Sequence, residues 1–358
     1  MSKVVRILVV DDSPLFVEAL TMVLEEDPEL TVVGFAGDGV AALRMVEKLE
    51  PDLITMDIQM PQMDGLTAVE KIMSSRPTPI LMLTGDPART GKKWHFDALK
   101  RGALDLQVKP RLITEIGADQ ATVEAEAEAL RAHIKLLASV PVVYRRQRTG
   151  TITGTHRARS AQPSSTPRLG AVGIVSSTGG PPVLAEILEG LPADFPLPIL
   201  VVQHLAAGFA PHLVDWLRSA TQLKVEMAAE GAHPEPGKVY VAPSGRHLVL
   251  DGRGNLHLDG NTPPFHGHRP AGTILLESMA RQCGAAAVGL VLTGMGVDGA
   301  RGLAAIGERG GATLAQDEQS SAVYGMPRAA AEEGKASLIV PRHELARTLL
   351  EVSRRRVG

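Results

Sequence analysis

The sequence predicts an α/β protein made of two doubly wound domains that are joined by a linker. Short apolar runs alternate with helical patterns up to about residue 138, and the same alternation resumes at residue 169. The stretch between them, 139–168, is rich in Arg, Ser, Thr and Gly and has no hydrophobic period. Alternating strands and helices form parallel sheets covered by helices on both faces. A chain of 358 residues is also long for one hydrophobic core.

The first half contains five apolar runs, each followed by a helical pattern. We expect strands at 6–10, 30–36, 53–57, 79–85 and 103–109, and helices at 15–27 and near 39–49, 65–75, 91–101 and 113–138. Such an arrangement predicts a five-stranded parallel sheet, in which functional residues gather at the carboxyl ends of the strands.

The second half repeats this alternation and adds shorter runs. We expect strands at 171–175, 198–204, 286–294 and 312–317, and helices near 183–190, 210–219 and 299–308. The runs "KVYVAP", "HLVLD" and "NLHL" follow one another like hairpin strands, so we expect a mostly parallel sheet with antiparallel additions. We expect Trp216 in the core, and Cys283 buried and unreactive.

Composition argues against a general nucleic-acid-binding protein, a disulfide-bonded secreted protein and a membrane protein. The net charge of −3 gives no general attraction to nucleic acid, although the basic linker could touch DNA or an acidic protein. The single cysteine cannot form an internal disulfide, which fits a reducing compartment. The first apolar run stops at Asp11 and Asp12, which is unlike a signal peptide or a membrane span. We therefore expect a cytoplasmic protein with a solvated linker.

Polar side chains follow four strands of the first predicted sheet. Asp11 and Asp12 follow the first strand, Asp57 ends the third, Thr84 ends the fourth and Lys109 ends the fifth. Clustered carboxylates need a cation, and hard oxygen ligands suit Mg²⁺. A metal, an ammonium group and a carboxylate together favour an aspartate that accepts a phosphoryl group. A single acid at a strand end would more simply be a solvated turn residue.

The segments "VVDDS", "DIQMPQMDG", "MLTGD" and "VKP" resemble the receiver domain of bacterial response regulators, which is flavodoxin-like, over about residues 4–125. The resemblance implies that a chemotaxis-type histidine kinase phosphorylates Asp57. The implied surroundings are Mg²⁺ held by Asp11, Asp12, Asp57 and the Gln59 carbonyl, phosphoryl contacts from Thr84 and Lys109, and a cis Lys109–Pro110 bond. Receivers often carry an aromatic switch residue where this chain has Leu106, so we do not expect coupling through aromatic rotation.

The stretch "VSSTGGPP", residues 175–182, lies between a predicted strand and a predicted helix. Alone, it fits an anion cradle, a tight turn or a nucleophile. It lacks the lysine-containing phosphate-loop pattern, the dinucleotide pattern and the hydrolase elbow. His204 ends the next strand and Asp298 lies in a glycine-rich turn after another. Serine, histidine and aspartate at one sheet edge are the parts that ester or amide hydrolysis needs, with backbone N–H groups near Thr178 and Met295 for the oxyanion.

The segments "SSTGG", "VVQHLAAGFAPHL", "PGKVYVAPSGRHL", "LTGMGVDGARGL" and "AQDEQSSAVYGMPRAA" resemble the catalytic domain of chemotaxis protein-glutamate methylesterases, over about 170–345. The resemblance implies that Ser177 is the nucleophile, that His204 and Asp298 complete the triad, and that the Met295 N–H stabilises the oxyanion. The implied activity is hydrolysis of glutamate γ-methyl esters, and deamidation of some glutamines, on methyl-accepting chemoreceptors. The resemblance also implies that the unphosphorylated receiver covers the active site.

Two departures from that resemblance stand out. Ser176 takes a position where relatives usually have alanine, and we expect it to have little effect. The run "HRPAGTILLES", which includes Ala271–Thr273, replaces a common Arg-Pro-Ser-Val-Asp run and is expected to alter substrate or interface contacts. We expect domains at 1–125 and 169–350, with a helical end and basic linker at 126–168.

Two other functions stay open at this stage. One is a response regulator whose output binds nucleic acid through the basic linker, although no helix-turn-helix is evident. The other is a non-catalytic scaffold that retains the triad residues. The pair His266 and His268, with no cysteine or acidic third ligand nearby, is poor support for a metal site, and the esterase needs no cofactor.

Overall fold

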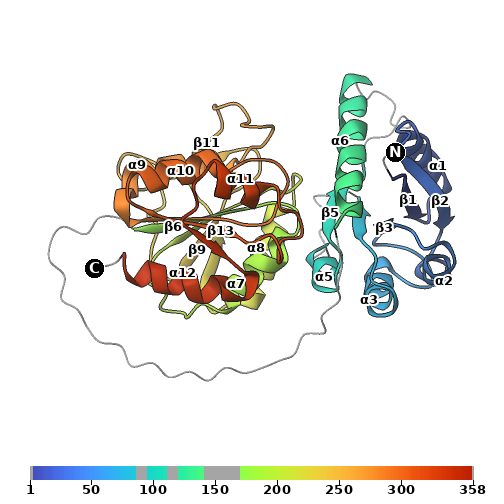
Figure 1. The fold of residues 1–358 in the computed structure, drawn as a ribbon, viewed down its shortest axis with the longest axis horizontal. Helices are drawn as coiled ribbons and strands as arrows, with labels where there is room; N and C mark the ends of the chain where they lie inside the picture. The colour runs from blue at the N-terminus through green and yellow to red at the C-terminus, as the bar shows by residue number, and fades with distance from the viewer. Residues whose placement is uncertain (1–2, 86–94, 111–119, 141–169, 357–358) are drawn as a thin grey trace.

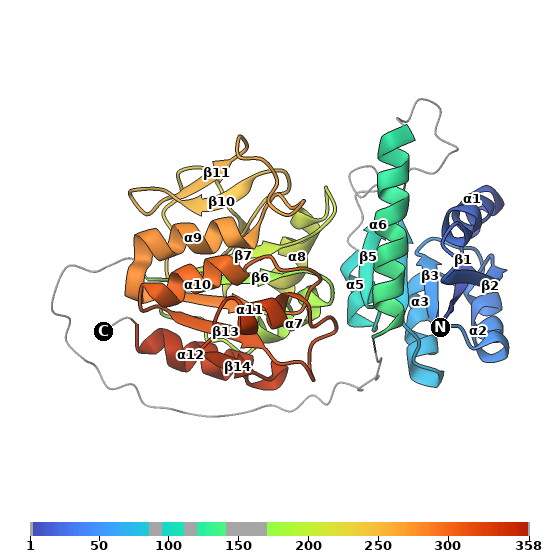
Figure 2. The same cartoon turned by 45° about the horizontal axis from the view of Figure 1, so that its top comes forward.

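The computed structural model describes residues 3–85, 95–110, 120–140 and 170–356, which form two α/β domains (Figures 1 and 2). Most of the predicted basic linker therefore lies outside the described residues. No helix among those ranges is long and apolar enough to cross a membrane.

The N-terminal domain is built on a five-stranded parallel sheet, as predicted, and its strand order is β2-β1-β3-β4-β5. Its strands are β1 (Val5–Val10), β2 (Leu30–Ala36), β3 (Leu53–Asp57), β4 (Ile80–Thr84) and β5 (Asp105–Val108). Its helices are α1 (Pro14–Glu25), α2 (Gly39–Leu49), α3 (Gly65–Ser75), α5 (His95–Lys100) and α6 (Gln120–Ala138). Helices α1 and α6 cover one face, while α2, α3 and α5 cover the other (Figure 1).

Three polar side chains start the first three helices close to the strand ends. Ser13, Asp38 and Asp64 each accept a hydrogen bond from a backbone N–H in the first turn of α1, α2 and α3, respectively. Such caps satisfy N–H groups that a helix start leaves without partners. They fix where the loops after β1, β2 and β3 end, and so position the polar residues of the sheet edge.

Helix α6 packs in the core of the N-terminal domain. Its side chains Ala127, Leu130, Ile134 and Leu137 are buried against apolar residues of α1 and of the sheet. The predicted domain limit at residue 125 falls inside this helix, which remains in contact with the N-terminal sheet up to its last turn.

The C-terminal domain has a seven-stranded parallel sheet with strand order β14-β13-β12-β6-β7-β9-β8. The strands are β6 (Ala171–Ser176), β7 (Ile199–Gln203), β8 (Lys224–Met227), β9 (Lys238–Val241), β12 (Ala287–Val291), β13 (Ala312–Gln316) and β14 (Leu338–Val340). The helices are α7 (Gly180–Glu189), α8 (Ala210–Ala220), α9 (Gly272–Cys283), α10 (Ala300–Glu308), α11 (Met326–Glu332) and α12 (Leu345–Arg354), with short 3-10 turns at Gly284–Ala286 and Arg342–Glu344. Helices α9, α10 and α11 lie on one face and α7, α8 and α12 on the other (Figure 1).

One detail of the strand prediction was wrong. Strand β9 does not form a hairpin with its successor but lies inside the large sheet, parallel to both β7 and β8. Its residues Val239, Tyr240 and Val241 are all buried, which suits a strand covered on both faces. Only β10 (His247–Leu250) and β11 (Leu256–Asp259) form the antiparallel pair, and it packs on α9.

The two domains meet where α5 contacts α7 and α8. The ring of Phe96 on α5 stacks on Trp216 of α8, with centroids 5.3 Å apart and planes 17° from parallel. The Lys100 ammonium lies 5.5 Å from the centre of the indole ring. Trp216 is buried, as predicted, but the N-terminal domain supplies part of its cover. Cys283 is buried, and burial raises the pKa of its thiol to about 12.

Candidate active site and phosphoryl-acceptor site

The three predicted triad residues follow three adjacent strands. Strands β6 and β7 pair Ser176 with Gln203, so that the next residues, Ser177 and His204, lie side by side at the sheet edge. The His204 backbone N–H donates to the Ser176 carbonyl at 2.9 Å and extends this pairing. Strand β12 borders β6 on the other side, and Asp298 lies in the loop that follows it. The structure therefore brings all three together.

His204 and Asp298 form a buried hydrogen-bonded pair. His204 Nε2 lies 2.8 Å from Asp298 Oδ2, and 5% and 1% of the two side chains are exposed. The Asp298 carboxylate also accepts backbone N–H groups from Gly272 at 2.6 Å, Thr273 at 2.9 Å and Gly299 at 2.9 Å. Burial alone would raise the pKa of Asp298, but the hydrogen bonds from His204, Thr273 and Gly272 hold it well below its usual value. Asp298 is therefore an anion that fixes the proton on His204 Nε2.

The other imidazole nitrogen is left free to act as a base. His204 Nδ1 is buried and has no hydrogen-bond partner among the described residues. The Ser177 hydroxyl makes no hydrogen bond to it in this structure; such contacts often tighten only when substrate binds. The Ser177 backbone N–H donates to the Thr293 carbonyl at 3.1 Å. A Cβ on Gly294 would lie 2.7 Å from the Ser177 Cβ, so glycine is needed for this close approach.

Two backbone N–H groups flank the serine without a partner. Those of Thr178 and Met295 donate to no other group within the described ranges. The Thr178 carbonyl accepts a hydrogen bond from Thr293 Oγ1 at 3.0 Å, which ties the turn after β6 to the loop after β12. Helix α7 begins at Gly180, and its N-terminal dipole favours negative charge nearby. The role of these two N–H groups as oxyanion donors stays a prediction.

His268 lies next to the triad, although sequence reasoning did not place it there. Its ring stacks on that of His204, with centroids 3.7 Å apart and planes 8° from parallel. Phe265 and His268 exchange backbone hydrogen bonds across His266 and Gly267, which both have positive φ, the pattern of a type I′ turn. Burial, reinforced by the nearby His204, lowers the pKa of His268 to about 4, so the ring is neutral near pH 7.

The backbone of the segment Ala271–Thr273 supports the triad. Its Gly272 and Thr273 N–H groups hold Asp298, because α9 starts at Gly272 next to this carboxylate. The expected effect of this segment on substrate or interface contacts stays a prediction. The Thr273 hydroxyl accepts the Gly299 N–H at 2.8 Å. Buried His247 accepts the Ala271 N–H through Nδ1 and donates through Nε2 to the Pro263 carbonyl, both at 3.1 Å. The sequence analysis missed this supporting role because side-chain motifs do not reveal main-chain hydrogen bonds.

The acidic residues of the N-terminal domain also converge. Carboxylate oxygens of Asp11, Asp12 and Asp57 lie within 4.8 Å of one another. Lys109 Nζ lies 2.7 Å from Asp11 Oδ2 and 2.9 Å from Asp57 Oδ2, and Thr84 is buried at the end of β4. Burial raises the pKa of Asp11 above its usual value despite Lys109. Burial would lower the pKa of Lys109, but Asp11 and Asp57 outweigh it, so the ammonium stays charged.

This cluster fits a hard divalent cation. Three carboxylates with one exposed member, Asp12, offer oxygen ligands and leave positions for water, which Mg²⁺ prefers. Gln59, whose carbonyl was predicted as a further ligand, lies in the adjoining loop.

The structure also bears on two other features expected of the first domain, a cis peptide bond and the residue at position 106. The cis peptide bond of the described residues is Arg269–Pro270, so the expected cis Lys109–Pro110 bond was wrong. Leu106, which takes the position where receivers often carry an aromatic switch residue, is buried in the hydrophobic core.

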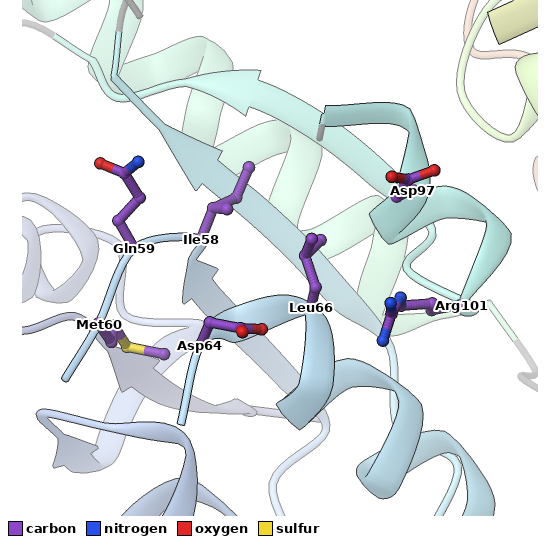
Figure 3. Close-up of a pocket in the computed structure, with 7 residues that line it drawn as sticks. All are labelled: Ile58, Gln59, Met60, Asp64, Leu66, Asp97 and Arg101. Carbon is purple, nitrogen blue, oxygen red and sulfur yellow. The ribbon is translucent and has the colours of Figure 1, made fainter. Parts of the chain in front are cut away.

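A pocket of about 660 Å³ adjoins this cluster (Figure 3). It extends from the loop after β3 to α5, and its lining comprises Ile58, Gln59, Met60, Asp64, Leu66, Asp97 and Arg101. Arg101 also pairs with Glu70 of α3 at 2.6 Å. The pocket therefore separates the carboxylate site from the helix that carries Phe96 to the other domain.

Comparison with known proteins agrees with this arrangement. Residues 172–349 match the family described as CheB methylesterase, and residues 7–118 match the response regulator receiver domain. A protein-glutamate methylesterase/protein-glutamine glutaminase of Anaeromyxobacter dehalogenans is 43% identical over 98% of this chain and 97% of its own length. One of Myxococcus xanthus is 40% identical over 97% of this chain and 93% of its own. The chain belongs to the CheB methylesterase family.

The crystal structure of the CheB methylesterase catalytic domain of Thermotoga maritima supports the same assignment. It is 37% identical, with a TM-score of 0.50 over 51% of this chain and 97% of its own. The predicted chemotaxis methylesterase with a receiver domain is thus confirmed as an enzyme of the CheB family. A nucleic-acid-binding output and a non-catalytic scaffold, the two alternatives from the sequence, are not what these relatives indicate.

Proposed function

We propose that this CheB-family enzyme hydrolyses glutamate γ-methyl esters, and deamidates specific glutamines, on methyl-accepting chemoreceptors through a Ser177–His204–Asp298 mechanism that phosphorylation of Asp57 activates. The observation that carries the proposal is the buried His204–Asp298 pair, which leaves His204 Nδ1 unpartnered at the strand end next to the one that Ser177 follows. The cytoplasmic location and the association with membrane receptor arrays, both expected from the sequence, belong to this proposal.

Acylation begins with proton transfer. His204 Nδ1 takes the Ser177 Oγ proton while Oγ attacks the γ-carbonyl carbon of the substrate. The imidazolium that forms keeps its Nε2–H on the Asp298 carboxylate, which stabilises the positive charge. The carbonyl oxygen becomes an oxyanion, and the free N–H groups of Thr178 and Met295 are its donors.

The leaving group and water complete the cycle. His204 returns the proton to the methoxide oxygen, so that methanol leaves and an acyl-enzyme remains. A water molecule, deprotonated by the same nitrogen, then attacks the acyl carbon and releases Ser177 and a free glutamate. With a glutamine substrate, ammonia leaves in place of methanol, and the product is the same glutamate.

The receiver supplies the control of this activity. We assign Asp57 as the acceptor of a phosphoryl group from a chemotaxis-type histidine kinase, with Mg²⁺ held by Asp11, Asp12 and Asp57. When bound, Mg²⁺ neutralises charge on the transferring phosphoryl oxygens. Lys109 already bridges Asp11 and Asp57, so a phosphoryl group on Asp57 must reorganise this ion pair.

The contact between α5 and α8 supports a domain rearrangement as the means of activation. Phe96 and Lys100 cover Trp216 on the helix that follows the His204 loop. The pocket between the loop after Asp57 and α5 gives that helix room to move (Figure 3). Phosphorylation would then favour a second packing in which this contact is loosened and substrate reaches Ser177.

Methanol release from methylated chemoreceptor membranes tests both the nucleophile Ser177 and the phosphorylation site Asp57. We expect Ser177→Ala to abolish release, while Ser219→Ala, an exposed serine that bonds only within α8, keeps the basal rate. We expect Asp57→Asn to keep the basal rate and to lose stimulation by acetyl phosphate. Release by Ser177→Ala would contradict the nucleophile, and equal stimulation of wild type and Asp57→Asn would contradict the phosphorylation site.

A further inference from the structure

Gln203 is a buried polar residue that the mechanism above does not use. It ends β7, directly before His204, and its side chain is enclosed by protein. Its Nε2 donates to the Ser177 carbonyl at 2.9 Å and to the His204 carbonyl at 3.0 Å. Its Oε1 accepts the Ser176 hydroxyl at 2.6 Å. One amide thus binds the main chain of both the nucleophile and the base.

The chemistry of the partners fixes the orientation of this amide. Two carbonyl oxygens can only accept hydrogen bonds, so the NH₂ group must face them, and Oε1 must face the Ser176 hydroxyl. A Cβ on Gly180 would lie 2.6 Å from Oε1, so the start of α7 closes the remaining space. The bond from Ser176 is buried and the two bonds to the carbonyls are partly buried, and a lost partner is costly in such surroundings.

We propose that Gln203 is a positioning residue that holds Ser177 and His204 at a fixed separation, and that Ser176 acts through Gln203 by orienting its amide. This inference rests on the proposed Ser177–His204 mechanism. It also gives Ser176 a role, although alanine was the residue expected at that position. Neither side chain contacts the reacting atoms, so both act on the rate of acylation and not on substrate affinity.

The size of the effect follows from the geometry. Ser177 and His204 follow neighbouring strands, whose pairing extends as far as the His204 N–H on the Ser176 carbonyl. The Gln203 amide adds the link that joins the Ser177 carbonyl to the His204 carbonyl. A misplacement of about 1 Å between reacting groups can cost roughly a hundredfold in rate. Losing both carbonyl bonds should therefore reduce kcat far more than losing the hydroxyl that only orients the amide.

A double-mutant cycle in the full chain tests the proposal. Wild type, Gln203→Met, Ser176→Ala and the double variant are compared by kcat and KM for methanol release from methylated chemoreceptor membranes with saturating acetyl phosphate. Gln222→Met, which removes an exposed glutamine, is the matched control. We expect Gln203→Met to lower kcat roughly 30-fold with KM within about twofold. Ser176→Ala should lower kcat about threefold, and the double variant should match Gln203→Met alone.

Three results would overturn the proposal: an unchanged kcat in Gln203→Met, a loss that falls on KM, or losses that multiply in the double variant. Circular dichroism melting is recorded for each protein. If Gln203→Met does not fold, Gln203→Glu replaces it, because it keeps the side-chain shape and turns the donor pair into acceptors facing two carbonyls; an unchanged kcat there also contradicts the role. Ser177→Ala run beside them separates the two ideas, since activity without Ser177 removes the mechanism itself.

Discussion

The imidazole rings of His204 and His268 lie face to face, 3.7 Å apart between centroids. In the proposed mechanism, His204 becomes positively charged when it takes the proton of Ser177, and a neutral aromatic ring stabilises a cation held over its face. Burial keeps the pKa of His268 at about 4, so the two rings do not both carry charge at neutral pH. The stack also fixes the plane in which His204 Nε2 reaches Asp298.

Replacing the His268 ring tests whether it stabilises the charged form of His204. We expect His268→Ala to lower kcat roughly tenfold, because a desolvated cation–π contact contributes about 1–2 kcal/mol to the charged state. His268→Phe keeps a flat neutral ring and should retain kcat within about threefold. Steady-state methanol release by the three proteins measures this. An equal loss in both variants would show that a specific group of His268, and not its ring face, is what matters.

The same residue predicts a pH dependence of stability. The pKa of His268 is lowered from 6.5 to about 4 in the folded protein, so the unfolded chain binds a proton between these values that the folded chain does not. The free energy of unfolding therefore falls as pH drops from about 6.5 towards 4, and it is unaffected by this group above 6.5. Urea unfolding at pH 7.5 and pH 5 should show a smaller decrease for His268→Phe than for wild type. Identical decreases would contradict the shifted pKa.

Asp298 accepts four hydrogen bonds, so its replacement has two separate consequences. In Asp298→Asn the amide NH₂ must face a backbone N–H or His204 Nε2, and the imidazole loses the anion that fixes its tautomer. We expect kcat to fall about 10³- to 10⁴-fold, as triad aspartates elsewhere suggest. We also expect the melting temperature of the catalytic domain to fall, since a buried charged network is broken. Differential scanning calorimetry beside the activity assay distinguishes the two effects.

Much of this arrangement could be predicted from the sequence, for reasons that are physical. Buried parallel strands read as apolar runs, and polar residues directly after them must meet at one edge; this placed Asp57 near Asp11 and Ser177 near His204. The resemblance to known families then supplied roles for these residues. The short edge strands β8 and β14 were missed, because they have few buried residues to mark them.

What could not be predicted depends on the main chain and on long-range packing. Asp298 is held by the N–H groups of Gly272 and Thr273, a role that any residue type can fill. His268 reaches His204 through a turn whose second residue is histidine, where asparagine would have been the clearer signal. Trp216 reads as a core residue of an amphipathic helix, and only the folded chain shows that Phe96 covers it.

The contact between Phe96 and Trp216 predicts a variant with raised basal activity. Trp216→Leu keeps an apolar side chain on α8 but removes the stacked ring and the Lys100 contact. An aromatic pair of this kind contributes about 0.5–1.5 kcal/mol beyond its burial, which shifts a two-state equilibrium roughly two- to tenfold. We expect basal methanol release to rise by this factor and the rate with acetyl phosphate to stay near that of wild type. Phe96→Leu should behave alike, because it removes the partner ring from the other domain.

Removal of divalent cations separates the two sites. Asp11, Asp12 and Asp57 are the cluster of possible metal ligands found within the described ranges, and it lies in the receiver. Chelation by EDTA should abolish stimulation by acetyl phosphate and leave the basal rate unchanged, since Ser177 and His204 need no metal for acyl transfer. Asp12→Asn, which removes one carboxylate of the cluster, should shift the Mg²⁺ concentration needed for half-maximal stimulation upwards, roughly tenfold or more. A basal rate that falls on chelation would instead place a metal requirement in the esterase.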